Sequence, residues 1–517
     1  MKKFILLFVV CLTLLPLIKP GLFDVHDPTS IVRIATLSDT LKAGQFPAAW
    51  TNQLNEGFGY PLFLYYAPVF SYLGAFIKLF VPIYLLSLKL SLFILVGVAA
   101  LGIYKLMRQF LGSYGALIAS VSYTLLPYHA STLYVRGSYA EGVTWTLLPW
   151  LLYLWSQKDR GYKWVVSTSL ITSLFFLSHN SLPFAFIPFL LIWIFIFKPK
   201  TLGNSLLALV LSIGASSWFL LPVIFERGLV QIDKVALLTK YSDHFLSPMQ
   251  LWHSAWGYGG SSSLGQIDGM SFMLGKFQLV LAAISLVYLR LKKRLDKVVI
   301  FLLATFIFYA FMTTMASSFV WDLVSPLQIL QFPWRLITFA SFAVSALAGY
   351  FVVYLPKFTK PLAVLLITCG ILFFNLKFFV PQREISYDDS SFLSQEKLAT
   401  VARDKIPEYL PASMPAFPST SLSDSLSRTS TSVYGSLVTS EPAPLTISTA
   451  YMPQWQLKIN DSIVPIQASQ DGLITTTTDI PAGSLKVDLT WHRTAVENIG
   501  IWVSALSLLV MIGLLFI

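Results

Sequence analysis

The stretch GNSLLALVLSIGASSWFLLPV, residues 203–223, carries no charged side chain and is long enough to cross a membrane as one helix. Comparable apolar runs recur from one end of the chain to the other. Of the 517 residues, 55% are apolar and only 12% are charged, about half the charged share of a typical soluble protein. We therefore predict an α-helical polytopic membrane protein with about twelve transmembrane helices. The candidate spans are residues 4–20, 84–106, 113–128, 143–156, 164–178, 183–197, 203–223, 277–290, 298–316, 334–354, 361–379 and 498–517.

The basic residues orient these spans, because lysine and arginine concentrate in short cytoplasmic loops. Segment 62–80 is apolar but ambiguous. If it does not cross, but lies on or dips into the outer face, one side receives nearly all of the basic loops, with Asp159 and Asp296 as its only acidic residues. The opposite arrangement puts most basic loops outside. We therefore predict a multi-pass protein of the plasma membrane with both termini cytoplasmic. The net charge of +11 comes mostly from these loops and predicts no nucleic-acid partner.

The predicted topology divides the chain into three parts. A transmembrane domain, residues 1–380, carries outer loops 21–83, 129–142 and 224–276. An extracytoplasmic domain, 381–496, precedes a last transmembrane helix, 497–517. Residues 413–444 are rich in Ser, Thr and Pro, which is typical of a linker. A small β-sandwich is then predicted from strand-like runs at residues 444–451, 455–459, 472–478 and 485–491.

The first outer loop opens with two carboxylates and an imidazole in the motif DVHD, residues 24–27. Asp24 or Asp27 can act as a general base, or with His26 hold a divalent cation such as Mg²⁺ or Mn²⁺. The structural alternative is that Asp24 caps a turn and Asp27 begins a helix. Apolar residues at helical spacing over residues 31–41 predict an amphipathic helix lying on the outer leaflet.

Arginines near the outer ends of apolar runs are candidate phosphate ligands. Arg136 can hold a phosphate by a forked pair of hydrogen bonds, or form a structural pair with Glu141. Arg335 opens a later helix, where an arginine predicts function unless it snorkels to the interface. Arg33 lies on the predicted amphipathic helix.

Aromatic and polar residues of the outer loops are candidate substrate contacts, since aromatic faces stack on sugar rings. An interfacial aromatic belt, a self-packing loop and a helix cap are the alternatives. No phosphate-binding glycine loop, dinucleotide fingerprint or serine-hydrolase elbow occurs, which argues against ATP-driven transport. The candidate substrate-binding residues are Tyr60, Glu141, His179, Asn180, Asp243, His244, Trp256 and Tyr258.

Nearly the whole chain resembles bacterial membrane proteins of the 6-pyruvoyl-tetrahydropterin synthase-related family. The sequence departs from the family pattern at Ala48-Ala49 and at Phe58, and it has no zinc-binding His triad of a pterin enzyme. The motifs that carry the resemblance are VHD (25–27) with Arg33, LKAGQFPAAW (41–50), GFGYPLF (57–63), YVRG (134–137) with Glu141, LSHN (177–180), DHF (243–245), WGYG (256–259), QFPWR (331–335) and EYLP (408–411).

The resemblance implies a GT-C-like fold, that of the C-type polytopic glycosyltransferases. In that superfamily a carboxylate of the first outer loop serves the chemistry, and the sugar donor is normally a polyprenyl phosphate or diphosphate. Asp27 matches the family's aspartate best, and Asp24 is its rival. Arg136, Arg335 and Arg33 would neutralise the lipid phosphate.

We therefore expect a cell-envelope glycosyltransferase that moves a sugar from a polyprenyl-phosphate donor to a glycan, lipid or protein acceptor on the outer face. The alternatives are a lipid or polysaccharide transporter or flippase, and a non-catalytic assembly protein.

Overall fold

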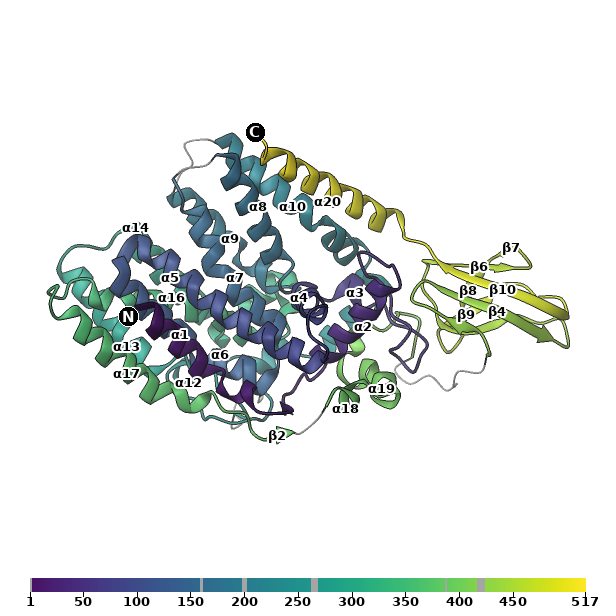
Figure 1. Ribbon diagram of the computed structural model, residues 1–517, viewed down its shortest axis with the longest axis horizontal. Helices are drawn as coiled ribbons and strands as arrows, with labels where there is room; N and C mark the ends of the chain where they lie inside the picture. The colour runs from purple at the N-terminus through teal and green to yellow at the C-terminus, as the bar shows by residue number, and fades with distance from the viewer. Residues whose placement is uncertain (1, 159–160, 198–201, 262–267, 386–387, 416–423) are drawn as a thin grey trace.

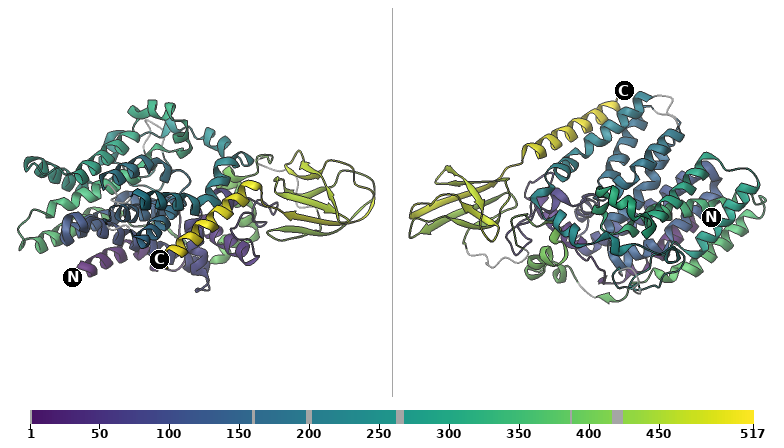
Figure 2. Two further views of the ribbon diagram at one scale, coloured as in Figure 1. Left: turned by 90° about the horizontal axis from the view of Figure 1, so that it is seen from above. Right: turned by 180° about the vertical axis from the view of Figure 1, so that it is seen from behind.

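The computed structural model describes residues 2–158, 161–197, 202–261, 268–385, 388–415 and 424–517. Long helices form its body, and a β-rich part projects from one end (Figure 1, Figure 2). Each predicted apolar stretch contains a helix. The long helices are α1 (Lys2–Thr13), α5 (Tyr84–Thr124), α7 (Tyr139–Trp155), α8 (Tyr162–Phe176), α9 (Leu182–Ile196), α10 (Leu202–Phe225), α13 (Lys276–Leu291), α14 (Lys297–Met312), α16 (Ile337–Ala348), α17 (Lys360–Asn375) and α20 (Ala495–Leu514).

Within the described residues, five helical segments are long and apolar enough to cross a membrane. The count of about twelve spans, and the side on which each loop lies, remain predictions. The predicted spans 84–106 and 113–128 are joined without a loop in α5, which bends at Gly112, where the backbone has a φ of 63°. The five segments are Tyr84–Arg136, Leu202–Phe225, Pro333–Val352, Lys360–Phe378 and Ala495–Leu514.

The ambiguous segment 62–80 forms two short helices, α3 (Leu62–Tyr65) and α4 (Val69–Lys78). The 10 residues of α4 extend about 15 Å, roughly half the thickness of a hydrocarbon core. This helix is therefore too short to cross by itself.

The helix predicted to lie on a leaflet is instead enclosed by protein. α2 (Ser30–Lys42) is buried from Ser30 to Ser38 on all of its faces. It packs against α4 and α5, and α18 (Asp389–Leu393) also contacts it. The apolar spacing identified the helix correctly, but its apolar face is covered by other segments of the chain.

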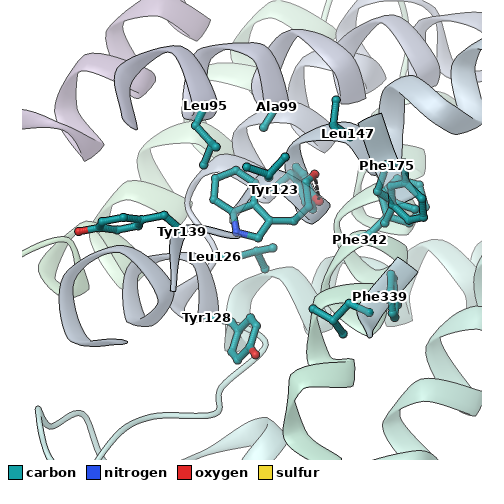
Figure 3. Close-up of a cluster of buried hydrophobic side chains, with 14 of the residues drawn as sticks. Leu95, Ala99, Tyr123, Leu126, Tyr128, Tyr139, Leu147, Phe175, Phe339 and Phe342 are labelled. Atoms are coloured by element: carbon teal, nitrogen blue, oxygen red, sulfur yellow. Dashed lines mark hydrogen bonds between the residues drawn. The ribbon is translucent and has the colours of Figure 1, made fainter. Parts of the chain in front are cut away.

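The membrane body has an aromatic core between α5, α7 and α16 (Figure 3). The ring of Tyr123 meets that of Phe342 edge to face at 6.1 Å, and its hydroxyl donates to the carbonyl of Trp145 at 2.7 Å. Elsewhere, small residues bring α10 and α20 together. A Cβ on Gly500 would lie 2.7 Å from the carbonyl oxygen of Ser217, the kind of close approach that favours small residues at membrane helix interfaces.

The β-rich part contains two antiparallel sheets, which confirms the predicted β region near the C-terminus. The linker prediction is wrong for part of residues 413–444, because strand β4 there pairs with β10 along its whole length. Residues 416–423 of that linker lie outside the described part. One sheet has the order β3-β4-β10-β6-β7 and the other β5-β9-β8, with strands β3 (Ser427–Arg428), β4 (Ser432–Thr439), β5 (Thr446–Ala450), β6 (Trp455–Ile459), β7 (Ser462–Val464), β8 (Ile466–Ala468), β9 (Leu473–Thr476) and β10 (Gly483–Trp491).

The first loop is anchored in this β-rich part. Trp50 is 1% exposed and belongs to its core. Its ring lies 5.5 Å from that of Trp455 and 5.1 Å from that of Trp491. Gly59 makes room for the indole, since a Cβ there would lie 2.1 Å from the Trp50 ring.

Candidate functional site

A cavity of about 200 Å³ opens where the first loop, the start of α7, the α8–α9 turn and the segment before α16 meet. Five residues that the sequence analysis singled out line it. They come from positions spread over more than 300 residues of sequence, and they share only their place at the ends of helices. These five are Asp27, Arg33, His179, Asn180 and Arg335.

Backbone pairing holds Asp27 at the cavity. The amide of His26 donates to the carbonyl of Val135 at 2.9 Å, and the amide of Asp27 donates to that of Arg136 at 3.0 Å. Gly137, with a φ of 68°, permits this approach, because a Cβ there would lie 2.6 Å from the Asp27 carbonyl oxygen. The YVRG motif therefore positions the segment that carries Asp27.

The carboxylate of Asp27 already has partners. One oxygen accepts from both the amide and the hydroxyl of Thr29, and the other from Arg33 Nη1 at 3.1 Å. Arg33 also donates to the hydroxyl of Tyr66 at 2.9 Å and lies over its ring. Burial alone would lower the pKa of Arg33, but the neighbouring Asp27 carboxylate more than compensates. The pKa of Arg33 therefore lies above its usual value. Arg33 is thus a fixed cation at the cavity wall.

Arg335, by contrast, forms no ion pair with any described residue. It lies in the turn η7 (Pro333–Leu336), which opens α16. Its Nη1 donates to the carbonyl of Leu330 at 2.7 Å, and its buried Nε has no hydrogen-bond partner. A cation with unused donors in a polar cavity is suited to an anionic ligand.

His179 and Asn180 have different tasks. The ring Nδ1 of His179 accepts from the amides of Ser181 and Leu182 at 3.2 and 3.4 Å, so the proton of the neutral ring sits on Nε2. Burial, and then Arg335, lowers the pKa of His179 to about 3. Asn180 bridges the carbonyl of Tyr65 and the amide of Ala67 at 2.6 and 2.8 Å. His179 offers a neutral donor, whereas Asn180 shapes the wall.

The sequence analysis missed Glu408 as a site residue. It lies in the turn η10 (Pro407–Tyr409) after α19 (Gln395–Lys405) and lines the same cavity. Burial raises its pKa, which its own backbone amide and Arg33 partly offset. The motif EYLP contributed to the family resemblance, but nothing in its spacing placed Glu408 beside Asp27.

Arg136 does not line the cavity, and the structural alternative considered for it is the one observed. Its Nη2 donates to the carboxylate of Glu141 at 2.7 Å, with both side chains buried. Tyr128 and Thr338 also donate to Glu141, at 2.6 and 2.9 Å. The Arg136 guanidinium lies 4.5 Å from the ring centre of Trp334, next to Arg335. This pair supports the turn that presents Arg335.

The remaining candidates lie outside the cavity. Asp24 pairs with Arg383 at 2.8 Å, and His26 bonds to the carbonyl of Tyr258 at 2.8 Å. Within the described residues, no group of three His, Cys, Asp or Glu side chains could hold a metal ion. Tyr60 is buried and donates to the carbonyl of Ile406.

Three of the four candidates of the third loop pack on the protein itself, and the fourth is exposed. His244 bonds to Ser261 at 3.1 Å, Trp256 packs on Phe378, and Tyr258 donates to Val380 at 2.8 Å. Asp243 is exposed beside His244. None of these four residues lines the cavity, which favours the self-packing loop that was one of the alternatives.

The apolar helices and the polar cavity define a multi-helix membrane protein with a candidate ligand site. The chain matches the family model of the 6-pyruvoyl-tetrahydropterin synthase related domain, described as a membrane protein, over residues 63–380. It therefore belongs to this family. A comparison with curated proteins gives no match. Asp27, Arg33 and Glu408 lie outside the matched region, which supplies His179, Asn180 and Arg335 to the cavity.

Proposed function

We propose that this protein transfers a sugar from a polyprenyl-phosphate-linked donor to a hydroxyl-bearing acceptor in the cavity, on the extracytoplasmic face that the basic loops predict. One observation carries the proposal. Arg335, a cation without an acidic partner among the described residues, shares a cavity with the carboxylates of Asp27 and Glu408 and with that of Asp233, which pairs with Arg227.

The cations of the cavity would stabilise the phosphate leaving group. As the bond between sugar and phosphate breaks, negative charge grows on the phosphate, and fixed donors aimed at it stabilise the transition state. Arg335 has a free buried Nε, and Arg33 is held in place by Asp27 and Tyr66. Lys405 adds a third positive charge at the cavity wall.

The carboxylates of the cavity would activate the acceptor hydroxyl. A hydroxyl becomes a nucleophile when a carboxylate takes its proton, and both Asp27 and Glu408 line the space where such a hydroxyl would sit. The Nε2–H of His179 provides a donor that stays neutral at physiological pH. A flippase or an assembly protein needs no general base, so carboxylates placed beside the cations favour transfer.

The proposal is tested by binding. Purified protein in lipid nanodiscs is titrated with a polyprenyl phosphate and, separately, with ordinary anionic phospholipid. We expect selective binding of the polyprenyl phosphate, weakened at least about tenfold in Arg335→Ala, partly kept in Arg335→Lys and unchanged in Arg290→Ala. Arg290 is an exposed arginine at the end of α13 and serves as the matched control. Equal binding by wild type and Arg335→Ala would refute the proposal.

A further inference from the structure

Three carboxylates line the cavity, and they differ in their bonding. Asp233 is exposed and pairs with Arg227 at 3.4 Å. Asp27 accepts hydrogen bonds from Thr29 and Arg33. No other described side chain donates a hydrogen bond to Glu408, which its own backbone amide contacts. Both oxygens of Asp27 are therefore occupied by donors, whereas the Glu408 carboxylate is desolvated without a side-chain partner, which favours its protonated form.

We propose that Glu408 accepts the proton of the acceptor hydroxyl, whereas Asp27 positions Arg33 at the phosphate. This division of roles rests on the proposed sugar transfer. In the step, the acceptor oxygen forms a bond to the anomeric carbon and its proton passes to the Glu408 carboxylate. The bond between the anomeric carbon and the phosphate oxygen breaks, and the phosphate leaves with the electron pair beside Arg335 and Arg33.

The position of Glu408 supports this role. It enters the cavity from η10, the turn that links α19 to the β-rich part, and its neighbour Tyr409 packs edge to face on Tyr66 at 6.0 Å. The charge and titration of Glu408 depend on groups from every surrounding segment. These groups are Asp27, Arg33, Tyr60, Tyr66, His179, Asp233, Arg335, Lys405 and Tyr409.

A phosphate bound beside Glu408 adds further negative charge to the cavity. The protonated form of Glu408 is then favoured, so binding takes up a proton. The affinity for a lipid phosphate should consequently fall as pH rises through the titration of Glu408. If binding takes up one proton, the affinity changes by at most about tenfold per pH unit.

The experiment uses a polyprenyl phosphosugar as the probe, because its phosphodiester does not titrate near neutral pH. Its affinity for the full-length protein in nanodiscs is measured between about pH 5 and pH 8 for wild type, Glu408→Gln, Asp27→Asn and Glu396→Gln. Glu396 lies on α19, is exposed and does not line the cavity, so its variant is the matched control for lost charge.

We expect affinity to fall with pH in wild type, Asp27→Asn and Glu396→Gln. In Glu408→Gln the binding should be tighter at high pH and flat across the range. A wild-type slope in Glu408→Gln overturns the inference but leaves the phosphate site intact. Absence of binding in wild type itself would instead remove the proposed function, and the inference with it. Glu408→Asp, which keeps a titratable carboxylate, should show the wild-type slope. This result would separate the loss of the titratable group from a general disturbance of folding.

Discussion

The carboxylate of Asp27 accepts a hydrogen bond from Arg33 Nη1 at 3.1 Å across one wall of a cavity, while Arg335 enters that cavity without an acidic partner among the described residues. This unequal pairing gives the two arginines different tasks. Arg33 is a fixed cation, and Arg335 has donors free for a ligand.

Asp27→Asn should weaken phosphate binding through Arg33. The substitution leaves a guanidinium that is 2% exposed without its counter-ion. Breaking a fully buried pair costs about 3–5 kcal/mol. The cost is smaller here, since a third of the Asp27 side chain faces solvent. We expect a lower midpoint of thermal unfolding and a phosphate affinity reduced by about threefold to tenfold. Unchanged unfolding and binding would show that Asp27 does not hold Arg33.

Arg136→Ala tests whether the buried pair is structural. Removing the guanidinium leaves the Glu141 carboxylate buried among the helices without a counter-ion, at a cost of about 3–5 kcal/mol. We expect a large loss of thermal stability, partly recovered in the double variant Arg136→Met/Glu141→Gln. If Arg136→Ala instead folds with wild-type stability and loses only phosphate binding, Arg136 is a ligand contact and our description of the pair is wrong.

Trp50→Ala should loosen the β-rich part from the first loop. Its indole is 1% exposed and contacts two tryptophans of the sheets, and truncating such a side chain costs about 3–5 kcal/mol. We expect faster hydrogen exchange in β6 and β10 and in the segment around Trp50. Phe46→Ala, at an exposed position of the same loop, is the control and should change neither. Wild-type exchange rates in Trp50→Ala would contradict the anchoring role.

His179 should make the protein sensitive to acid. Its pKa is about 3 in the folded protein, mainly because of burial, and about 6.5 when unfolded. The unfolded state therefore binds the extra proton as pH falls below about 6.5, and stability declines from there toward about pH 3. His179→Gln should lose less stability than wild type between about pH 7 and pH 5 in thermal unfolding. Parallel pH profiles for the two proteins would show that the ring is not held neutral.

The helical stretches and the four predicted strands followed from composition and periodicity, because bilayer thickness and side-chain alternation leave direct marks on a sequence. Arg335, His179 and Asp27 were found for a related reason, since polar residues at the ends of apolar runs stand out. For Glu408 and Arg136, the sequence pattern did not predict the surroundings of the side chain. Whether a charged side chain meets a ligand or a buried partner depends on contacts between distant segments, and only the structure brings Glu408 to Asp27 and Glu141 to Arg136.

The same limit explains the two errors in the fold. Residues 31–41 have the spacing of an amphipathic helix, but the sequence did not show that α4, α5 and α18 cover its apolar side. The Ser- and Thr-rich stretch before residue 444 resembled a linker, yet β4 within it pairs with β10 along its whole length, and its side chains alternate between a more buried and an exposed face.

The most direct test is a cryo-electron-microscopy structure of the full-length protein in nanodiscs with a polyprenyl phosphate. We expect density for the phosphate inside the cavity, with an oxygen about 2.7–2.9 Å from the guanidinium of Arg335 and Glu408 facing it. A phosphate bound elsewhere, with the cavity empty beside Arg335, would contradict the central claim.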